Sequence, residues 1–372
     1  MPVIMTTFIL FISSSAQSAS EKIYQSAGEA FRFEILTQQK DVVWGFDFIN
    51  EDQLIFTERG GALRSLNLKS KTVSNIDGVP IVYASGQGGL LDVRVHPKEK
   101  SKIYFSFSEP TKDGATTALA FAILQGASLT NFKKIFSAHQ PNLNTIHFGS
   151  RIEFDGKGHL WLSIGDRDQR DRAQSLNFHN GKIIRLNEDG SIPADNPFSK
   201  DKTVKPEVWS YGHRNPQGLV RNTKTGELWE TEMGPRGGDE LNLIRAGLNY
   251  GWPVITYGRE YYGPKIGLGT SKEGMEQPIA YWVPSISPSA LTIYTGHRFP
   301  KWVDNIFIGT LSGQHLRRLR LENSRVVEQE ALLNDLQLRI RNVRTGLDGY
   351  LYFSTDDGKI ARLVPAQTVN KQ

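Results

Sequence analysis

The sequence predicts an all-β protein built as a β-propeller, and three observations support this fold class. Short apolar strands separated by Gly, Asp and Asn turns run from about Phe31 to Leu363. Apolar and polar residues alternate within several of these strands, which is the period of a β-strand. A turn–strand unit also recurs, as in the segments DGKGHLWLSIGD (155–166), TGELWETEMG (225–234) and LDGYLYFSTDDG (347–358).

Imperfect recurrence of this kind is typical of propeller blades, although an array of β-sandwiches would also produce it. The repeats are spread evenly and no linker separates them, which favours one closed ring over residues 21–372. The periodicity alone does not give the number of blades. Amphipathic helical stretches are almost absent from the sequence.

Composition excludes several classes of site. The 372 residues contain no cysteine, so disulfides, zinc–thiolate centres and cysteine nucleophiles are excluded. The net charge of +5 is modest and the arginines are scattered, so we expect no nucleic-acid partner. Apart from the N-terminus, no segment is long and apolar enough to suggest an integral membrane segment.

Residues 1–20 resemble a secretory signal peptide. Met5 to Ile12 form an apolar core that is too short to span a bilayer, and small residues follow around Ala19. No Lys or Arg precedes the apolar run, and a hydrophobic strand at the terminus is the alternative interpretation. The pattern predicts export, with a periplasmic or secreted location.

His147 and Asp166 are candidates for proton chemistry. His147 lies just before a strand and is followed by Gly149, so a ligand could approach the backbone beside a potential general base. Asp166, with Asp168 and Asp171, could bind a cation or orient a histidine. A structural histidine and a polar turn are the alternatives.

The segment from Glu207 to Pro253 concentrates polar side chains among turn-forming glycines. Arg214 and Asn215 precede a proline, which favours an extended backbone and could direct the guanidinium at carboxylates or a carbonyl. A turn in which Arg214 caps carbonyls is the alternative. Gly234 and Pro235 could present two consecutive carbonyls, which are suitable calcium ligands.

Seven motifs together resemble one family. They are GQGGLLDVRVHP (86–97), HFGSRIEF (147–154), LSIGDR (162–167), GKIIRLNEDGSIPADNPF (181–198), YGHRNPQGL (211–219), MGPRGGDELNLIRAGLNYGWP (233–253) and RIRNVRTGLDGYLYFSTD (339–356). They follow one another in a single order and cover most of the chain. Together they resemble the soluble quinoprotein glucose/sorbosone dehydrogenases, and the resemblance is strongest to the aldose sugar dehydrogenase branch. This resemblance implies an all-β, six-bladed β-propeller that binds pyrroloquinoline quinone (PQQ) and calcium at one mouth of its channel.

The resemblance also implies roles for individual residues. His147 would remove the proton of a sugar's anomeric hydroxyl, Asp166 would orient that histidine, and Arg214 would stabilise charge on the quinone. The implied cofactor-binding residues are Gln87, Arg214, Asn215, Tyr261, Ser312, Gln314, Arg339 and Arg341. The implied calcium ligands are the carbonyls of Gly234 and Pro235, with Glu240 and the backbone of Tyr250 at a second calcium.

One departure from the family pattern concerns the cofactor. Relatives have a lysine on the strand corresponding to GTLSGQHL, where this chain has Ser312 with Gln314 nearby. The leading hypothesis is oxidation of aldoses at C1 to lactones, with electrons passed to an external acceptor. A non-catalytic propeller that binds sugar or protein, and a calcium-dependent propeller lactonase, are the alternatives.

Overall fold

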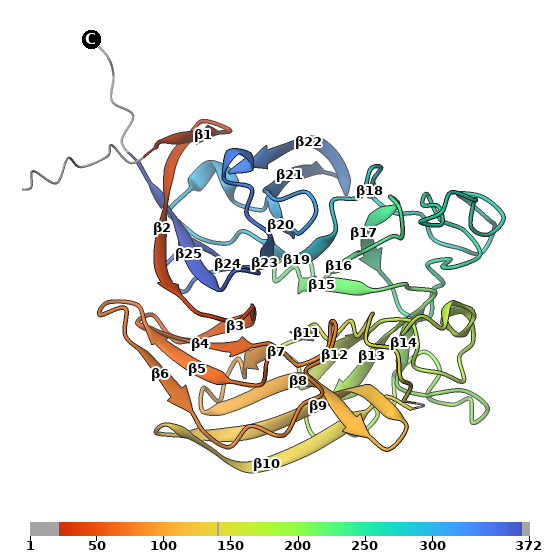
Figure 1. Ribbon diagram of the computed structural model, residues 1–372. Helices are drawn as coiled ribbons and strands as arrows, with labels where there is room; N and C mark the ends of the chain where they lie inside the picture. Colours follow the sequence, from red (N-terminus) through yellow and green to blue (C-terminus); the bar gives the residue numbers. More distant parts are fainter. Residues whose placement is uncertain (1–21, 140, 367–372) are drawn as a thin grey trace, which may run out of the picture.

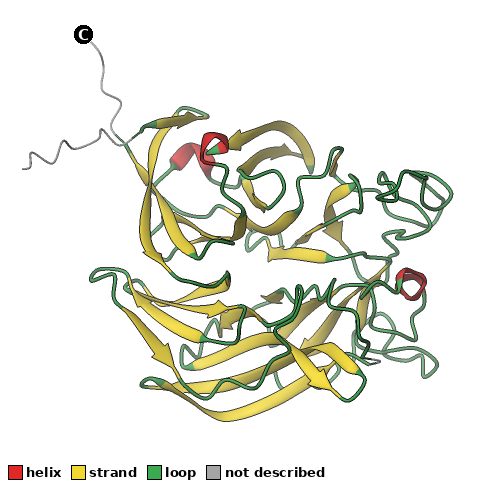
Figure 2. Cartoon of the chain, in the orientation of Figure 1, coloured by secondary structure: helices red, strands yellow, loops and turns green. Residues whose placement is uncertain are grey.

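Six antiparallel sheets surround a central axis in the computed structural model, which describes residues 22–139 and 141–366 (Figure 1). The predicted six-bladed β-propeller is therefore confirmed. The residues assigned to a signal peptide lie outside the described part of the chain. Helices in the described ranges are limited to three short 3-10 turns, η1 (Arg170–Gln174), η2 (Pro300–Trp302) and η3 (Asn334–Leu336) (Figure 2).

Five blades consist of four consecutive strands each, which follow one another from the inner to the outer edge of the blade. They are β3 (Val43–Asn50), β4 (Gln53–Glu58), β5 (Leu63–Asn67) and β6 (Val73–Ile76); β7 (Leu90–Val95), β8 (Lys102–Thr111), β9 (Gly114–Gln125) and β10 (Ser128–Ser137); β11 (Ile152–Phe154), β12 (His159–Ile164), β13 (Lys182–Asn187) and β14 (Val208–Tyr211); β15 (Pro216–Arg221), β16 (Leu228–Glu232), β17 (Asp239–Ile244) and β18 (Ala280–Trp282); β19 (Pro288–Ile293), β20 (Ile306–Thr310), β21 (Leu316–Glu322) and β22 (Arg325–Leu332).

The sixth blade joins the two ends of the described chain. Its strands are β23 (Ile340–Thr345), β24 (Leu351–Thr355), β25 (Lys359–Pro365), β2 (Glu29–Gln38) and β1 (Tyr24–Ser26). β2 pairs antiparallel with β25, with Phe31 opposite Pro365. Each inner strand also contacts the inner strands of both neighbouring blades, so the ring is closed.

The hydrophobic core lies largely between neighbouring blades. Phe46 and Phe48 of β3 pack with Tyr352 of the sixth blade, and the Phe48 and Tyr352 ring centroids are 5.0 Å apart. Ile55 of β4 packs in the same way against Phe105 of the next blade. Burial of these side chains is the main force that holds blade to blade.

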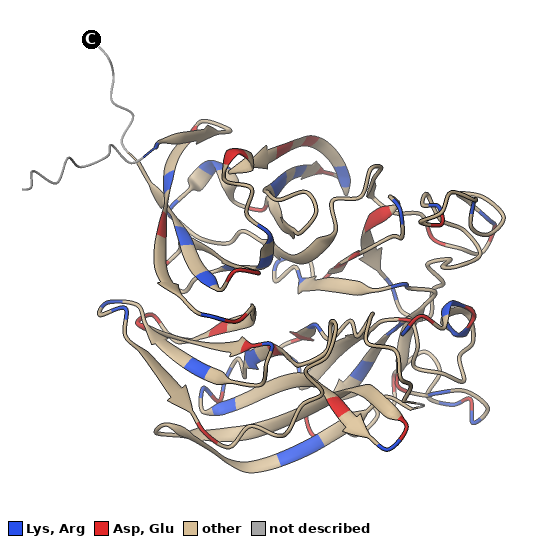
Figure 3. Ribbon diagram, in the orientation of Figure 1, with Lys and Arg blue, Asp and Glu red and all other residues tan. Residues whose placement is uncertain are grey.

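Charged residues of both signs are interspersed along the described chain (Figure 3). This distribution agrees with the modest net charge read from the sequence. None of the described helices is long and apolar enough to cross a membrane.

Candidate active site

A buried histidine–aspartate pair lies in the loops that flank β11 and β12. His147 precedes β11 and Asp166 follows β12, and the His147 Nδ1 to Asp166 Oδ1 distance is 2.7 Å. Both side chains are buried. Because Nδ1 is bound to the carboxylate, Nε2 is the ring nitrogen left to exchange a proton with a ligand. The two residues that the sequence predicted to act together are in contact.

The backbone at His147 is held in an unusual conformation. Its φ of 55° lies in the left-handed region, which few non-glycine residues adopt. Gln87 Oε1 accepts a hydrogen bond from the His147 N–H at 2.8 Å, and Asn215 Oδ1 accepts one from Gly149 N–H at 3.2 Å. A Cβ on Gly165 would lie 2.2 Å from the His147 carbonyl oxygen, so only glycine fits there. The predicted residues Gln87 and Asn215 therefore position the histidine loop.

Asp166 is fixed by donors on both carboxylate oxygens. Trp252 Nε1 donates to Oδ2 at 2.8 Å, and the backbone N–H of Asp168 donates to Oδ1 at 2.8 Å. Burial opposes ionisation of this carboxyl. The hydrogen bond and charge of His147, with the charge of Arg214, outweigh that effect and lower the pKa of Asp166 below its ordinary value. Asp166 is thus an ionised partner for an imidazolium.

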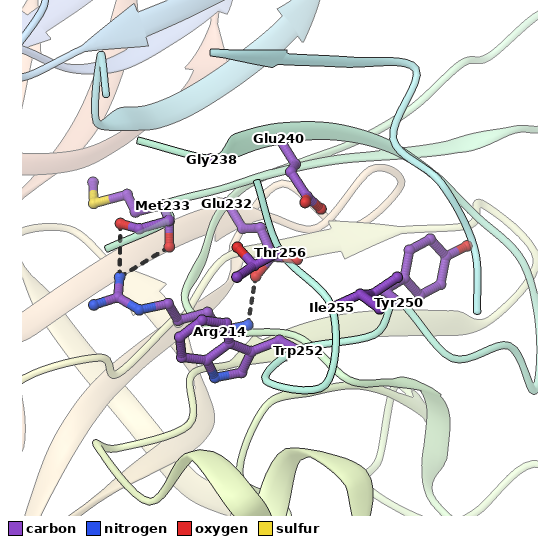
Figure 4. A pocket seen from close by; sticks show the side chains of 10 residues that line it. Arg214, Glu232, Met233, Gly238, Glu240, Tyr250, Trp252, Ile255 and Thr256 are labelled. Atoms are coloured by element: carbon purple, nitrogen blue, oxygen red, sulfur yellow. Dashed lines mark hydrogen bonds between the residues drawn. The ribbon is translucent and has the colours of Figure 1, made fainter. Parts of the chain in front are cut away.

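Arg214 precedes β15 and is also buried. Its Nη1 donates to the carbonyls of Met233 and Gly234, each at 3.0 Å, as the dashed lines in Figure 4 show. The guanidinium carbon lies 5.4 Å from the Trp252 ring centroid. The capping of carbonyls, which the sequence left open as an alternative role for Arg214, is therefore observed. The Gly234 carbonyl, which the resemblance implies as a calcium ligand, thus accepts a hydrogen bond from the Arg214 guanidinium.

A pocket of about 410 Å³, which we call the central pocket, opens over the inner strands. It is lined by Val42, Trp44, Arg59, Gln87, Phe148, Gly149, Asn215, Gln217, Met233, Leu311, Arg339, Arg341 and Asp356. Three arginines face one carboxylate there, which gives the lining an excess of positive charge. Asp356 binds Arg339 Nε at 2.9 Å and Arg341 Nε at 2.8 Å. Such a pocket suits an anionic ligand.

A second, smaller cavity of about 10 Å³ lies beside Arg214. Gly234, Glu240 and Tyr250 line it, together with Glu232. The Tyr250 ring points away from Glu240 (Figure 4). The volume is about that of one water-sized particle. The structure therefore gathers most of the predicted calcium ligands around one small space.

Carboxylates lie at and close to this small cavity: Glu232 and Glu240 line it, and Glu230 is near Glu232. Burial, together with the charge of Glu232, raises the pKa of Glu230 and of Glu240 well above the ordinary value. Glu230 Oε1 and Asn242 Oδ1 are buried without a hydrogen-bond partner. His213, Glu230 and Glu232 offer ligand atoms within 4.8 Å of one another. This region is short of positive charge, so a divalent cation fits its chemistry.

Three predicted cofactor residues lie apart from the central pocket. Tyr261 and Ser312 line an open groove of about 630 Å³, and Tyr261 is 67% exposed. Ser312 Oγ contacts Ser287 Oγ at 2.8 Å and donates to the Ser285 carbonyl at 3.1 Å. Gln314 lies two residues further on, half-buried and in a left-handed conformation. Pro235 lines the same groove.

Sequence reasoning missed four residues of the site: Trp252, Arg59, Asp356 and Trp44. Trp252 and Trp44 read as ordinary core residues in the sequence. Asp356 directly follows β24 inside the unit LDGYLYFSTDDG, and Asp166 lies just after β12. A carboxylate close to the end of the second strand of a blade is the signal that could have found Asp356.

Comparisons with known proteins agree with this geometry. A family model described as Glucose / Sorbosone dehydrogenase matches residues 40–362. Aldose sugar dehydrogenase YliI of Escherichia coli (strain K12) is 41% identical over 343 residues, covering 89% of this chain and 92% of that protein. The crystal structure of the apo-form of soluble aldose sugar dehydrogenase from Escherichia coli is 40% identical with a TM-score of 0.87, covering 90% of this chain and 100% of that one. The PQQ-bound form of aldose sugar dehydrogenase from Streptomyces coelicolor is 25% identical with a TM-score of 0.74, covering 90% and 98%.

Proposed function

The chain belongs to the glucose/sorbosone dehydrogenase family and is an oxidoreductase, and we propose that it oxidises aldoses at C1 to lactones with PQQ and calcium. The observation that supports the proposal most strongly is the buried His147–Asp166 pair beside the arginine-lined central pocket. A base and an anion-binding pocket at one mouth of the channel are what this reaction requires. A lactonase or a purely binding propeller does not explain both features.

The central pocket fits the cofactor in size and charge. PQQ carries three carboxylates, and the pocket offers Arg59, Arg339 and Arg341 against the single carboxylate of Asp356. Gln87 and Asn215 line the same pocket, so they would contact the cofactor while holding the histidine loop. When bound, PQQ supplies the acceptor for the hydride that leaves C1 of the sugar.

His147 supplies the proton acceptor. Its Nδ1 is held by Asp166, so Nε2 receives the proton of the anomeric hydroxyl, and the resulting imidazolium is stabilised by the adjacent carboxylate. Arg214 places a buried positive charge near the reacting centre, where it stabilises negative charge that develops there. Tyr261, Ser312 and Gln314 would contact the cofactor or substrate from the side of the open groove.

Calcium would bind at the small cavity and the adjoining turn. The carbonyls of Gly234 and Pro235 would hold the ion of the active site. Glu240 and the Tyr250 carbonyl would hold a second, structural ion. The raised pKa values of Glu230 and Glu240 support this assignment, because a divalent cation would offset the repulsion among the carboxylates. We also propose that the protein is exported to the periplasm or secreted, and that an external acceptor removes the electrons.

Reconstitution of the purified protein tests the proposal. Protein incubated with Ca²⁺ and PQQ is mixed with a panel of aldoses, and reduction of an artificial electron acceptor is followed. We expect sugar-dependent reduction only when both additions are present. If no aldose supports reduction and PQQ does not bind, the proposal is wrong. Hydrolysis of a lactone with calcium alone would instead favour the lactonase, and sugar binding without turnover would favour the non-catalytic propeller.

A pair of histidine variants tests the assignment of the base. His147→Ala should still bind PQQ but lose turnover by about 10²–10⁴-fold, the usual contribution of a general base. His159→Ala is the matched control, because His159 forms a similar pair with Asp155 at 2.6 Å at the start of β12. His159→Ala should keep its turnover. Normal turnover in His147→Ala would show that another group removes the proton.

A further inference from the structure

One buried guanidinium, carried by one blade, contacts the other five blades. Arg151 directly precedes β11, and its side chain reaches the inner strand of each of the other five blades. Its contacts are the Trp44 ring centroid at 4.0 Å, Asp92 Oδ1 at 3.2 Å, the Gln217 carbonyl at 2.7 Å, the Ser289 carbonyl at 2.7 Å and the Arg341 carbonyl at 2.9 Å. These partners lie on β3, β7, β15, β19 and β23 respectively.

Arg151 lies directly beneath the central pocket. Three of its partners, Trp44, Gln217 and Arg341, line that pocket, whereas Arg151 itself is only 2% exposed. The planar guanidinium donates in several fixed directions, which a lysine cannot reproduce. The Arg151 side chain therefore holds three parts of the pocket floor: the Trp44 ring and the backbone carbonyls of Gln217 and Arg341.

Arg151 shares its carboxylate partner with a second arginine. Asp92 is the carboxylate in contact with it, and Asp92 also lies 3.8 Å from Arg344. Burial lowers the pKa of Arg151 to about 10, and repulsion from Arg344 and Arg341 acts in the same direction, while Asp92 opposes it. The next charged group, Arg94 with Asp47 and Glu153, holds one arginine and two carboxylates, and both carboxylates also attract Arg344. The carboxylate that contacts Arg151 is therefore shared between two arginines, although arginines and carboxylates of the whole group are equal in number.

We infer that Arg151 is a positioning residue for the anionic cofactor: it fixes the pocket floor across all six blades and adds a buried positive charge beneath it. The inference rests on the proposed function, because the anion is PQQ. A neutral side chain at this position removes the charge and the directional hydrogen bonds. A lysine keeps the charge and removes most of the hydrogen bonds. The two contributions can therefore be separated.

The test uses Arg151→Met and Arg151→Lys, with Arg185→Met as a matched control. Arg185 is another buried arginine, whose guanidinium carbon lies 4.9 Å from the Trp209 ring centroid, on β13 away from the pocket. For each protein, the unfolding temperature without cofactor and the dissociation constant for PQQ in saturating Ca²⁺ are measured. Circular dichroism confirms that each variant is folded.

We expect Arg151→Met to bind PQQ more weakly by on the order of tenfold, the scale of one charge interaction at low effective dielectric. Arg151→Lys should regain part of that affinity while its unfolding temperature stays below that of the wild type. Arg185→Met should lower the unfolding temperature but leave PQQ affinity within about twofold of wild type. If Arg151→Lys folds and Arg151→Met does not, the PQQ affinity of Arg151→Lys is the deciding measurement. A PQQ affinity equal to that of the wild type overturns the positioning role.

Two results would overturn separate claims. If the wild type binds PQQ and Arg151→Met binds it equally well, Arg151 has a structural role only and this inference is wrong. If the wild type itself binds no PQQ, the proposed function fails. In that case the inference fails with it, and the unfolding temperatures report only on the role of Arg151 in the ring.

Discussion

Replacement of Trp252 by phenylalanine isolates one hydrogen bond of the catalytic pair. The change removes the indole N–H that donates to Asp166 Oδ2 at 2.8 Å. His147 and the backbone N–H of Asp168 remain, but both contact Oδ1. The carboxylate therefore loses the donor that fixes its second oxygen, while its hydrogen bond to the imidazole is formally intact.

The size of the effect follows from the charge of the acceptor. A hydrogen bond to an ionised group contributes about 1.5–3 kcal/mol. Since about 1.4 kcal/mol corresponds to a tenfold change in rate, the full loss in the transition state would lower kcat/KM roughly 10- to 150-fold. The buried location of Asp166 keeps solvent from replacing the lost donor. We therefore expect a reduction at the ten- to hundredfold level.

The assay is steady-state oxidation of an aldose at saturating PQQ and Ca²⁺, with saturation checked for each variant. Trp209→Phe is the matched control, because the Trp209 Nε1 is buried and has no hydrogen-bond partner. Trp209→Phe should change kcat/KM by no more than about twofold. The reasoning is refuted if Trp252→Phe keeps the wild-type kcat/KM, or if Trp209→Phe falls as far.

Three further predictions concern affinity, stability and pH. Arg341→Met should weaken PQQ binding more than Arg339→Met does, and a binding titration with PQQ measures both. The reason is that the Arg341 side chain is 14% exposed and the Arg339 side chain 48%, so the charge of Arg341 is less screened by solvent. Lys182→Met should lower the free energy of unfolding by on the order of 2–4 kcal/mol in denaturant titrations, since its buried ammonium donates to three backbone carbonyls at 2.6–3.0 Å. The pKa of Asp166 is lowered in the fold, so its stabilising effect is present above its ordinary value of 3.8 and is lost as the pH falls through the lower folded value. The difference in unfolding temperature between wild type and Asp166→Asn should therefore be largest near neutral pH and shrink in acid.

The fold was predictable to the level of strands, because strand periodicity is local. Alternation of apolar and polar residues and the glycine turns located the units ending near Asp166 and Asp356 correctly. The six-bladed count came from the family resemblance rather than from periodicity. Closure of the ring by β2 and β25 joins residues at opposite ends of the described chain, and no local pattern reports such a contact.

The site was predictable where chemistry and motif coincide. His147 and Asp166 were named together, and the structure brings them into contact. Trp252 was missed because a tryptophan beside glycine and proline gives no sign that its N–H meets a carboxylate. Ser312 and Tyr261, assigned to the cofactor by the resemblance, lie along the open groove, and their contact with the cofactor stays a prediction. Distances between loops of different blades depend on packing, which the sequence does not display.

The dependence of the site on the closed ring follows from where its parts originate. The base and its partner come from the blade of β11–β14, Arg214 precedes β15, and Arg341 comes from the sixth blade. None of these blades alone contains both the base and the arginines of the pocket. The sixth blade is complete only when β2 pairs with β25, while Arg341 lies on its inner strand β23, which contacts β19 and β3 of the neighbouring blades. Stability of the ring and organisation of the pocket therefore depend on the same contacts. The contacts between inner strands that close the ring also bring the residues of the pocket together.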